Sequence, residues 1–388
     1  MSTPRLLTVG IDIRLIGKQR TGDEVVFFQL VRELIRQRSD SIRYELFTDE
    51  TADDKLAVLR LKLEALGRGD IEIVSLPAKN RFVWNFISLS AQLFRHPVDV
   101  FHTQYILPLF LPQRLKVVTH IHDISFRVHP EWIGRVDRFF LSLLIPRTFR
   151  RSDAIVVPSE FTRSEILKYY SIPVEHVVVI ENAAAEEWFQ PIRNEEIERV
   201  TATYGLTPGR YYVSSGTMQP RKNIAFLIKA FVQAREQYGL SFPLVLTGSL
   251  AGHNVDSQVQ RQASAGGVLS VGYLSDADLR ALVSGAAAYI FPSLYEGFGI
   301  PIEEALAVGT EVFVSDIPVF HEVGRERVRY FDPFALAPLA ENLYTFSIDI
   351  SSHGKEAMCL PGSERLYSWV KSTEKIAQLY RALAATSR

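Results

Sequence analysis

Thirteen short apolar runs alternate with longer amphipathic segments along this chain, and this alternation most constrains its fold. The runs are LLTVGIDI, RYELF, IEIVSL, VDVFH, KVVTHIHD, AIVVPS and VVVIENA in the first half, and YYVSSG, PLVLTGS, VLSVGY, AAYIFPS, EVFVSD and VRYFD in the second. They are rich in Val and Ile, are apolar on both faces and often end in Gly, Ser, Asp or His. This pattern is typical of buried parallel strands that carry functional residues at their carboxyl ends.

Helical patterns such as Glu24–Gln37 and Asn223–Gln237 separate the runs. Strand and helix in regular alternation predict an α/β protein with two doubly wound, Rossmann-like domains. A polar stretch from Glu186 to Gly209 interrupts the alternation. We therefore expect an N-terminal domain over 1–188, a C-terminal domain over 189–363, and a final helical segment over 364–388. Ligands should bind in a cleft, at the carboxyl ends of facing strands.

Composition excludes several classes of protein. The 388 residues include 43 Lys and Arg against 44 Asp and Glu, which disfavours a protein that coats nucleic acid. A single cysteine, Cys359, excludes an intramolecular disulfide framework and a multi-thiolate metal site. The sequence contains no run of about 20 apolar residues and no signal peptide pattern. We expect a cytoplasmic protein or one that lies on the inner face of a membrane.

Residues 79–151 are locally basic, with 11 Lys and Arg against 4 Asp and Glu. Large apolar residues such as Trp84, Trp132 and Phe139 are interleaved with the basic ones. Such a stretch suits peripheral contact with a membrane surface or an anionic acceptor. It is equally typical of a solvated helix face over an ordinary core, and both interpretations stay open.

The segment Phe291–Thr310 is the strongest functional signal. A strand runs into a glycine-containing loop, and Pro301 suits the first position of the helix that follows. The amides of Phe298, Gly299 and Ile300 would then be free to bind a phosphate or a sugar hydroxyl.

Two carboxylates flank this loop. Glu296 precedes it, and Glu304 follows in the first helical turn beside Glu303, where the helix dipole favours acids. Because the loop reverses direction, Glu296 and Glu304 could face one ligand. A tight turn with acidic helix capping is the alternative interpretation.

A second signal is SSGTMQPRKNIAFLIKAF, from Ser214 to Phe231. A strand ends at Gly216, Arg221 and Lys222 follow, and Asn223 is placed to cap the next helix. An arginine fork and a lysine at a helix start make an anion site, unless they form an ordinary solvated cation pair. The sequence contains neither GxxxxGK[ST] nor GxGxxG, so a Walker loop and dinucleotide redox chemistry have little support.

Two weaker signals lie in the first half. In THIHDIS, His120 and His122 share a face of a strand, but spacing places no third ligand, so a hydrogen-bonding histidine is favoured over a metal site. In RTGDE, from Arg20 to Glu24, a loop with Gly22 opens a helix.

Taken together, these segments resemble the large retaining family 4 of GT-B glycosyltransferases. In the second half the resemblance is carried by RKN, by VGYLSDADLRALVSGAAAYIFPSLYEGFGIPIEEALAVGT and by SDIPVFHEV; in the first half it is carried by HIHDISFRVHPEW and VVPSEFTRSEILKYY. EGFGIPIEE contains the family's pair of glutamates with seven residues between them. The segment HDISFRVHPEW is similar to bacterial mannosyltransferases of O-antigen and polysaccharide assembly.

The resemblance implies a GT-B fold and a role for each candidate residue. Arg221 and Lys222 would neutralise the donor diphosphate, Glu304 would bind the nucleotide ribose, and Glu296 with the amides of Phe298, Gly299 and Ile300 would hold the donor sugar. His122 would touch that sugar from the opposite domain, and the loop at Gly22 would close near the phosphates. Gly216 is counted with the nucleotide-binding residues, and the final helix would brace the first domain.

The expected reaction transfers a hexose, with mannose favoured, from a nucleotide-diphosphate sugar to a saccharide or lipid-linked saccharide. The configuration at the sugar's C1 is retained. We expect no separate cofactor and no metal, with GDP-mannose favoured as co-substrate over UDP- and dTDP-sugars. The sequence departs from the family's TGIGR or TGGxR pattern, because Asp23 and Glu24 follow Gly22. A sugar-nucleotide epimerase, a phosphorylase of the same fold and an inactive partner-binding subunit are the alternatives.

Overall fold

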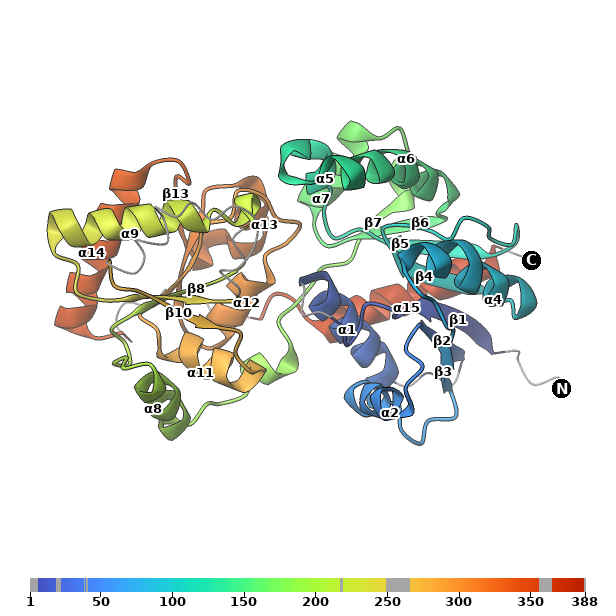
Figure 1. The fold of residues 1–388 in the computed structure, drawn as a ribbon, viewed down its shortest axis with the longest axis horizontal. Coiled ribbons are helices and arrows are strands. Elements are labelled where there is room, and N and C mark those ends of the chain that lie inside the picture. Colours follow the sequence, from blue (N-terminus) through green and yellow to red (C-terminus); the bar gives the residue numbers. More distant parts are fainter. Residues whose placement is uncertain are drawn as a thin grey trace. The chain divides into compact units, whose positions relative to one another are not determined.

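The structure is a computed structural model that describes residues 6–18, 22–37, 39, 41–216, 219–248, 266–355 and 365–386. Its contacts divide the chain into two units, Met1–Asn182 with Tyr367–Arg388, and Ala183–Leu366 (Figure 1). The boundaries expected from the sequence lie within six residues of these, at 188/189 and 363/364. Cys359 lies outside the described residues.

The first unit contains a seven-stranded sheet in the order β3-β2-β1-β4-β5-β6-β7. The strands are β1 (Leu7–Asp12), β2 (Ile42–Thr48), β3 (Ile71–Ser75), β4 (Val100–Gln104), β5 (Lys116–His120), β6 (Ala154–Val157) and β7 (Val177–Val179). All of their pairings are parallel, as the doubly apolar runs predict. The strand order reverses between β1 and β4, so these two neighbours form the sheet's topological switch point.

Helices cover this sheet, and the longer ones pack through buried apolar side chains. They are α1 (Gly22–Arg36), α2 (Asp53–Lys62), α3 (Arg81–Val83), η1 (Trp84–Ser88), α4 (Leu89–Arg95), α5 (Ser125–Val128), η2 (Pro130–Trp132), α6 (Arg135–Arg151), α7 (Glu160–Tyr169), η3 (Val174–His176) and the C-terminal α15 (Trp369–Ala385). On α1, for example, Phe27, Leu30 and Leu34 recur at helical spacing and are buried.

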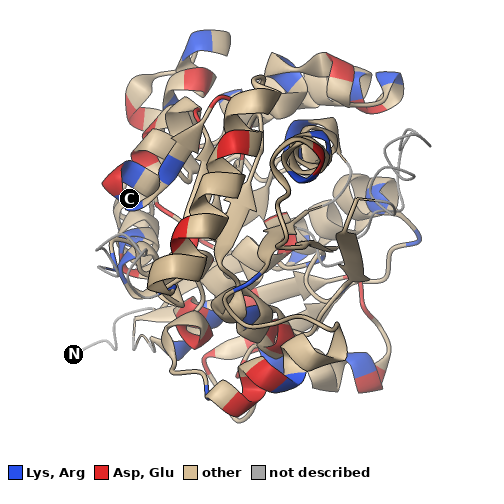
Figure 2. Cartoon of the chain, turned by 90° about the vertical axis from the view of Figure 1, so that its left-hand side faces the viewer, with Lys and Arg blue, Asp and Glu red and all other residues tan. Residues whose placement is uncertain are grey.

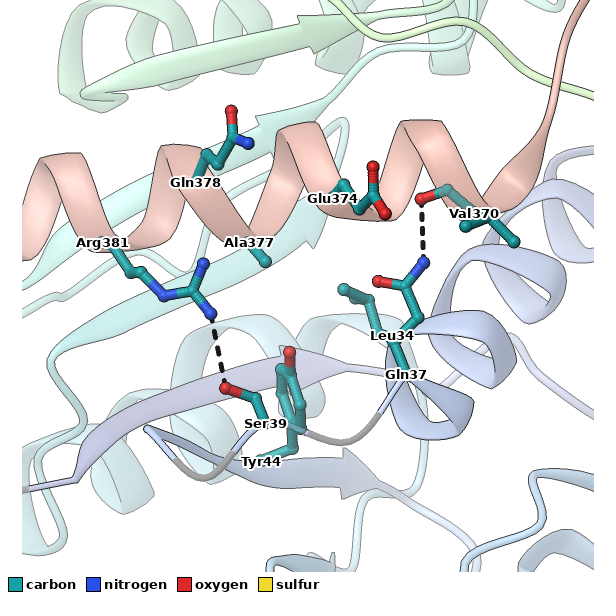
Figure 3. Close-up of a pocket in the computed structure, with 9 residues that line it drawn as sticks. All are labelled: Leu34, Gln37, Ser39, Tyr44, Val370, Glu374, Ala377, Gln378 and Arg381. Carbon is teal, nitrogen blue, oxygen red and sulfur yellow. Dashed lines mark hydrogen bonds between the residues drawn. The ribbon is translucent and has the colours of Figure 1, made fainter.

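Helix α15 lies against α1 and completes the first unit, although about 185 residues separate it from the rest of that unit. The Ser372 hydroxyl donates to the Glu181 carbonyl, and Lys375 pairs with the Glu181 carboxylate at 2.6 Å. A pocket of about 310 Å³ lies between α15, α1 and β2 (Figure 3). At its edge the side-chain amide of Gln37 donates a hydrogen bond to the Val370 carbonyl. None of the predicted site residues lines this pocket.

The second unit contains a six-stranded parallel sheet in the order β10-β9-β8-β11-β12-β13. Its strands are β8 (Tyr212–Ser215), β9 (Leu244–Thr247), β10 (Val268–Gly272), β11 (Ala288–Phe291), β12 (Glu311–Ser315) and β13 (Arg329–Phe331). All thirteen apolar runs are therefore strands, and the prediction of two doubly wound α/β sheets is confirmed.

The helical elements of the second unit are η4 (Glu186–Phe189), α8 (Asn194–Thr203), η5 (Pro220–Lys222), α9 (Ile224–Tyr238), α11 (Asp276–Gly285), α12 (Ile300–Ala307), α13 (Pro318–Gly324), η6 (Arg325–Arg327) and α14 (Leu336–His353). Helices α9 and α14 lie side by side on one face of the sheet, and α8 and α11 lie on the other (Figure 1). The core between α9, α14 and the sheet includes Leu227, Phe231 and Leu343, all fully buried.

Acidic and basic residues are intermingled along the helices, while most strand residues are uncharged (Figure 2). Among the described residues, no helix is both long and apolar enough to span a bilayer.

Candidate functional site

The second unit's switch point lies between β8 and β11, which pair directly through Ala288–Tyr212 and Tyr289–Val213. The chain leaves β8 toward one edge of the sheet and leaves β11 toward the other, and ligands of doubly wound sheets bind at the carboxyl ends of strands at such a point. The two segments singled out in the sequence follow these strands: η5 comes after β8, and the turn that contains Glu296 comes after β11. The fold thus brings together residues that are 74 and 75 positions apart.

Glu296 binds both predicted cations. One of its oxygens accepts from Arg221 Nη1 at 2.8 Å, and the other accepts from Lys222 Nζ at 2.6 Å. The Glu296 side chain is almost buried, whereas Arg221 is a quarter exposed and Lys222 about a sixth. The Leu294 amide also donates to the Arg221 carbonyl at 2.7 Å, which ties η5 to the loop after β11. These three side chains form a cluster, called here the cation cluster, with one net positive charge.

The charge state of Glu296 follows from this geometry. Burial alone would raise its pKa, but the charges of Lys222 and Arg221 outweigh burial and lower the pKa to about 2. Glu296 is therefore ionised at neutral pH and holds no proton to donate as a general acid.

The loop after β11 ends in a glycine-dependent turn. Gly299 has φ 109° and immediately precedes α12, and a Cβ on it would lie 3.0 Å from the Phe320 ring. The helix begins at Ile300, so Pro301 is its second residue rather than its first. Among the described residues, no backbone acceptor binds the Gly299 or Ile300 amide, so both N–H groups remain available at the helix start.

The neighbouring carboxylates Glu303 and Glu304 differ in environment. Glu303 is buried and forms an ion pair with Arg327, so it ties α12 to η6. Burial raises the pKa of Glu303. Glu304 is partly exposed and lies near Tyr289, where, after burial, its charge helps to raise the pKa of the tyrosine. Because Tyr289 lies on β11, Glu304 is the one of the two that lies near the switch point.

Two glycines lie close together after neighbouring strands, Gly216 after β8 and Gly248 after β9. Gly248 has φ 99°, and a Cβ there would lie 2.6 Å from the Gly216 carbonyl oxygen. At Gly216 itself the nearest atoms to an added Cβ, on Lys222 and Ile224, are 3.8 Å away. The free protein therefore has room for a side chain at position 216, and a requirement for glycine there would come from a ligand.

The prediction that Asn223 caps α9 with its side chain is wrong. Asn223 adopts a left-handed conformation, with φ 53°, and its amide donates to the Pro333 carbonyl at 3.1 Å. Arg221 and Lys222 consequently lie on η5, a separate turn that precedes α9. A contact with the loop after β13 competes with local capping here, and no local pattern reveals it.

Three histidines stack on one another in the first unit: His102 in the middle of β4, His120 at the end of β5 and His122 two residues beyond it. The His122 and His120 rings lie 4.6 Å apart, and His120 lies 5.9 Å from His102. His122 Nε2 is 2.7 Å from Gln104 Oε1, and His102 Nδ1 is 2.6 Å from the Tyr380 hydroxyl. Sequence reasoning missed His102 and Gln104, because β4 is brought beside β5 only by the parallel sheet.

These histidines lie in an apolar environment. Burial lowers the pKa of His102 to about 3 and lowers that of His120 well below its usual value. Both rings are neutral at physiological pH. Within the described part of the chain, no group of three or more His, Cys, Asp or Glu side chains is arranged to hold a metal ion.

Gly22 begins α1, and an added Cβ would meet no atom within 4 Å. Arg20 and Thr21 of the same loop lie outside the described residues. Glu24, one of the two acids that depart from the expected pattern, accepts the Gly17 amide at 2.7 Å. This acid therefore helps to shape the loop after β1.

Each of the two units matches a known protein family model. A family model described as Glycosyltransferase Family 4 matches residues 20–187, and one described as Glycosyl transferases group 1 matches residues 202–341. The O-antigen chain mannosyltransferase B of Escherichia coli is 28% identical over 278 residues, which are 71% of this chain and 72% of that protein. The O-antigen chain mannosyltransferase RfbU of Salmonella typhimurium is 30% identical over 60% of each chain, so the matched region spans less than two thirds of that relative.

The fold matches solved structures over nearly the whole chain. Anabaena HepE in complex with UDP-glucose superposes with a TM-score of 0.71 and 15% identity, covering 97% of this chain and 100% of that one. The two family models together span most of the sequence, and each falls on one of the two parallel sheets. This chain belongs to family 4, group 1, of the glycosyltransferases, and it has their GT-B fold.

Proposed function

We propose that the protein is a retaining mannosyltransferase that uses a nucleotide-diphosphate mannose, with GDP-mannose favoured. Its acceptor is a saccharide or lipid-linked saccharide in the assembly of a surface polysaccharide. The names of its relatives support mannose and this setting, because both the Escherichia coli and the Salmonella proteins are O-antigen chain mannosyltransferases.

The cation cluster carries the proposal. Cleavage of a sugar–diphosphate bond leaves negative charge on the departing phosphate, and preorganised cations stabilise that charge. Arg221 and Lys222 supply two positive charges at the switch point, and the free amides of Gly299 and Ile300 supply donors nearby in the chain. In this assignment the diphosphate binds the two cations, Glu304 binds the ribose, and the space above Gly216 admits the nucleotide.

The proposed reaction balances without a further reactant. The bond between sugar C1 and the diphosphate oxygen breaks, and the acceptor oxygen attacks C1 from the same face. The acceptor proton passes to the departing phosphate. Same-face attack is favoured over a covalent intermediate because both Glu296 oxygens already bind cations, which weakens this carboxylate as a nucleophile.

Thermal shift with GDP tests the proposal. A ligand that binds only the folded state raises the melting temperature, so GDP should stabilise the wild-type protein. Lys222→Ala and Glu304→Ala should abolish this response, while Lys229→Ala and Glu341→Ala, on exposed helix positions of the same unit, should keep it. An unchanged response in Lys222→Ala and Glu304→Ala would remove both assignments.

Incubation of GDP-mannose without acceptor separates the alternatives. An epimerase converts the donor to an isomer, whereas a transferase hydrolyses it only slowly. A pure partner-binding subunit need not respond to GDP.

Peripheral contact with an anionic membrane, through residues 79–151, is part of the proposal. Val136, Phe139 and Leu143 lie on one face of α6 and are each more than 60% exposed. Arg135 and Arg138 flank them, so an apolar stripe and basic charge coincide. Phe139→Ser with Leu143→Ser should reduce sedimentation with phosphatidylglycerol vesicles, and Leu61→Ser on α2 should not. Equal sedimentation of all three proteins would exclude this surface.

A further inference from the structure

Gln104 is the last residue of β4, one of the two strands that flank the first unit's switch point. Its side-chain oxygen lies 2.7 Å from His122 Nε2. Ligands of doubly wound sheets bind at the carboxyl ends of such strands. The side chain at this position is therefore placed to meet a ligand, although no sequence motif marks it.

The backbone beside Gln104 is strained. Tyr105 has φ 52°, and the Ile106 amide donates to the Gln104 carbonyl at 2.6 Å, which closes a three-residue turn. A turn of this kind with a left-handed, non-glycine central residue is rare. The Tyr105 ring also packs 5.7 Å from His122. Strain of this kind persists where the surroundings over-determine a conformation, and it concentrates at functional sites.

The environment of His122 decides which of its nitrogens carries the proton. Nδ1 is buried and has no hydrogen-bond partner among the described residues. A proton there would leave a buried, unpaired N–H group, which folded proteins almost never tolerate. With the proton on Nε2, the imidazole donates to Gln104 Oε1, and only an acceptor remains unpaired. The tautomer with its proton on Nε2 is therefore the favoured one.

This tautomer fixes the orientation of the Gln104 amide. Its oxygen faces His122, so its nitrogen points elsewhere. That nitrogen makes no hydrogen bond within the described part of the chain, and it is absent from the buried polar atoms without partners, so it reaches solvent. Of the side-chain polar atoms of Gln104 and His122, the Gln104 nitrogen is the one whose N–H groups can still donate a hydrogen bond.

We propose that the Gln104 amide nitrogen donates a hydrogen bond to an oxygen of a substrate sugar, and that His122 is the positioning residue that orients this amide. The inference rests on the proposed function. It assigns a role to Gln104, for which the sequence indicated none, and it gives His122 a positioning role in place of the expected contact with the sugar. The sugar belongs either to the donor or to the acceptor, and both offer the same hydroxyl chemistry.

Two substitutions separate donation from the bond to His122. Gln104→Glu keeps an oxygen for His122 Nε2–H but removes the N–H donors, whereas Gln104→Met removes both. Gln113→Glu, on an exposed loop of the same unit, is the matched control. Calorimetry with GDP and with GDP-mannose measures how much the donor sugar adds to the binding affinity. Saturation-transfer NMR with methyl α-mannoside measures the binding of an acceptor sugar.

Both Gln104 variants should weaken binding of GDP-mannose or of methyl α-mannoside by about threefold to tenfold, as expected for one lost hydrogen bond. GDP affinity should stay unchanged, and Gln113→Glu should match the wild type. Wild-type affinity of Gln104→Glu for both sugars would overturn the inference. Nitrogen-15 NMR that shows His122 protonated at Nδ1 would also overturn it. Absence of GDP binding by the wild-type protein would instead refute the proposed function.

Discussion

Replacing Glu296 by glutamine tests how the cation cluster is held together. The side chain is 10% exposed, and its pKa is lowered from 4.5 to about 2. A shift of that size corresponds to about 3 kcal/mol of interaction with the charged form. Since Arg221 is a quarter exposed, solvent screening reduces this to about 2 kcal/mol. Glu296→Gln should therefore lower the melting temperature of the second unit by about 4–8 °C.

The same substitution should strengthen the binding of GDP. Removal of the carboxylate raises the net charge of the cation cluster from one to two, and a diphosphate then no longer competes with Glu296 for Lys222 and Arg221. Calorimetry at neutral pH should show a several-fold gain in GDP affinity. Glu311→Gln is the matched control, because Glu311 is also buried and paired with a cation, Arg329, in the same unit. It should cost stability and leave GDP affinity unchanged.

The stability that Glu296 contributes should also depend on pH in a known direction. The pKa of Glu296 is lower in the folded than in the unfolded protein, so its stabilisation is complete above pH 4.5 and is lost as the pH falls toward 2. The stability gap between the wild type and Glu296→Gln should close over that range. A variant that melts like the wild type at pH 7, or that binds GDP more weakly, would refute the view that the carboxylate both stabilises and occupies the cations.

Two further predictions concern buried histidine and glycine. Burial holds the pKa of His120 well below its usual value of 6.5, so the folded protein loses stability as the pH falls below 6.5. His120→Leu should reduce the loss of stability that urea unfolding detects on acidification below pH 6.5, and an unchanged acid sensitivity would contradict this. Gly216→Ala should melt like the wild type yet bind GDP more weakly by calorimetry, whereas Gly248→Ala should lose about 1–3 kcal/mol of stability because of its positive φ and its contact with Gly216. A destabilised Gly216→Ala would mean that the glycine serves the fold and not the ligand.

The sheets could be predicted from the sequence because each strand is apolar on both faces. A run such as AIVV or LVLT, which has apolar residues on both faces, indicates a buried strand by itself. Every such run forms a parallel strand. Helix boundaries were less exact, and the start of α12 differs from the expectation by one residue. Local sequence therefore determined the layers of this protein well.

Long-range partners could not be predicted in the same way. The resemblance singled out Glu304, but the sequence does not show that its neighbour Glu303 is buried, because that depends on Arg327, which is 24 residues away. It does not show that His102 joins His120, since this depends on the pairing of β4 with β5. The adjacency of Arg221 and Lys222 suggested an anion site, but their shared carboxylate partner became visible only in the folded chain.

An acid between two cations at an anion site has a physical reason. Without Glu296, the positive charges of Arg221 and Lys222 would repel each other in a partly buried position, and each side chain would lose its ion pair. With it, both cations are oriented before a ligand arrives, which is the preorganisation that stabilisation of a leaving group requires. In the proposed reaction the diphosphate then meets a cluster with one net positive charge instead of two, so the gain in free energy is smaller than for capture by two bare cations. A weaker hold on the diphosphate suits an enzyme that must release this product after every transfer, because product release often limits turnover.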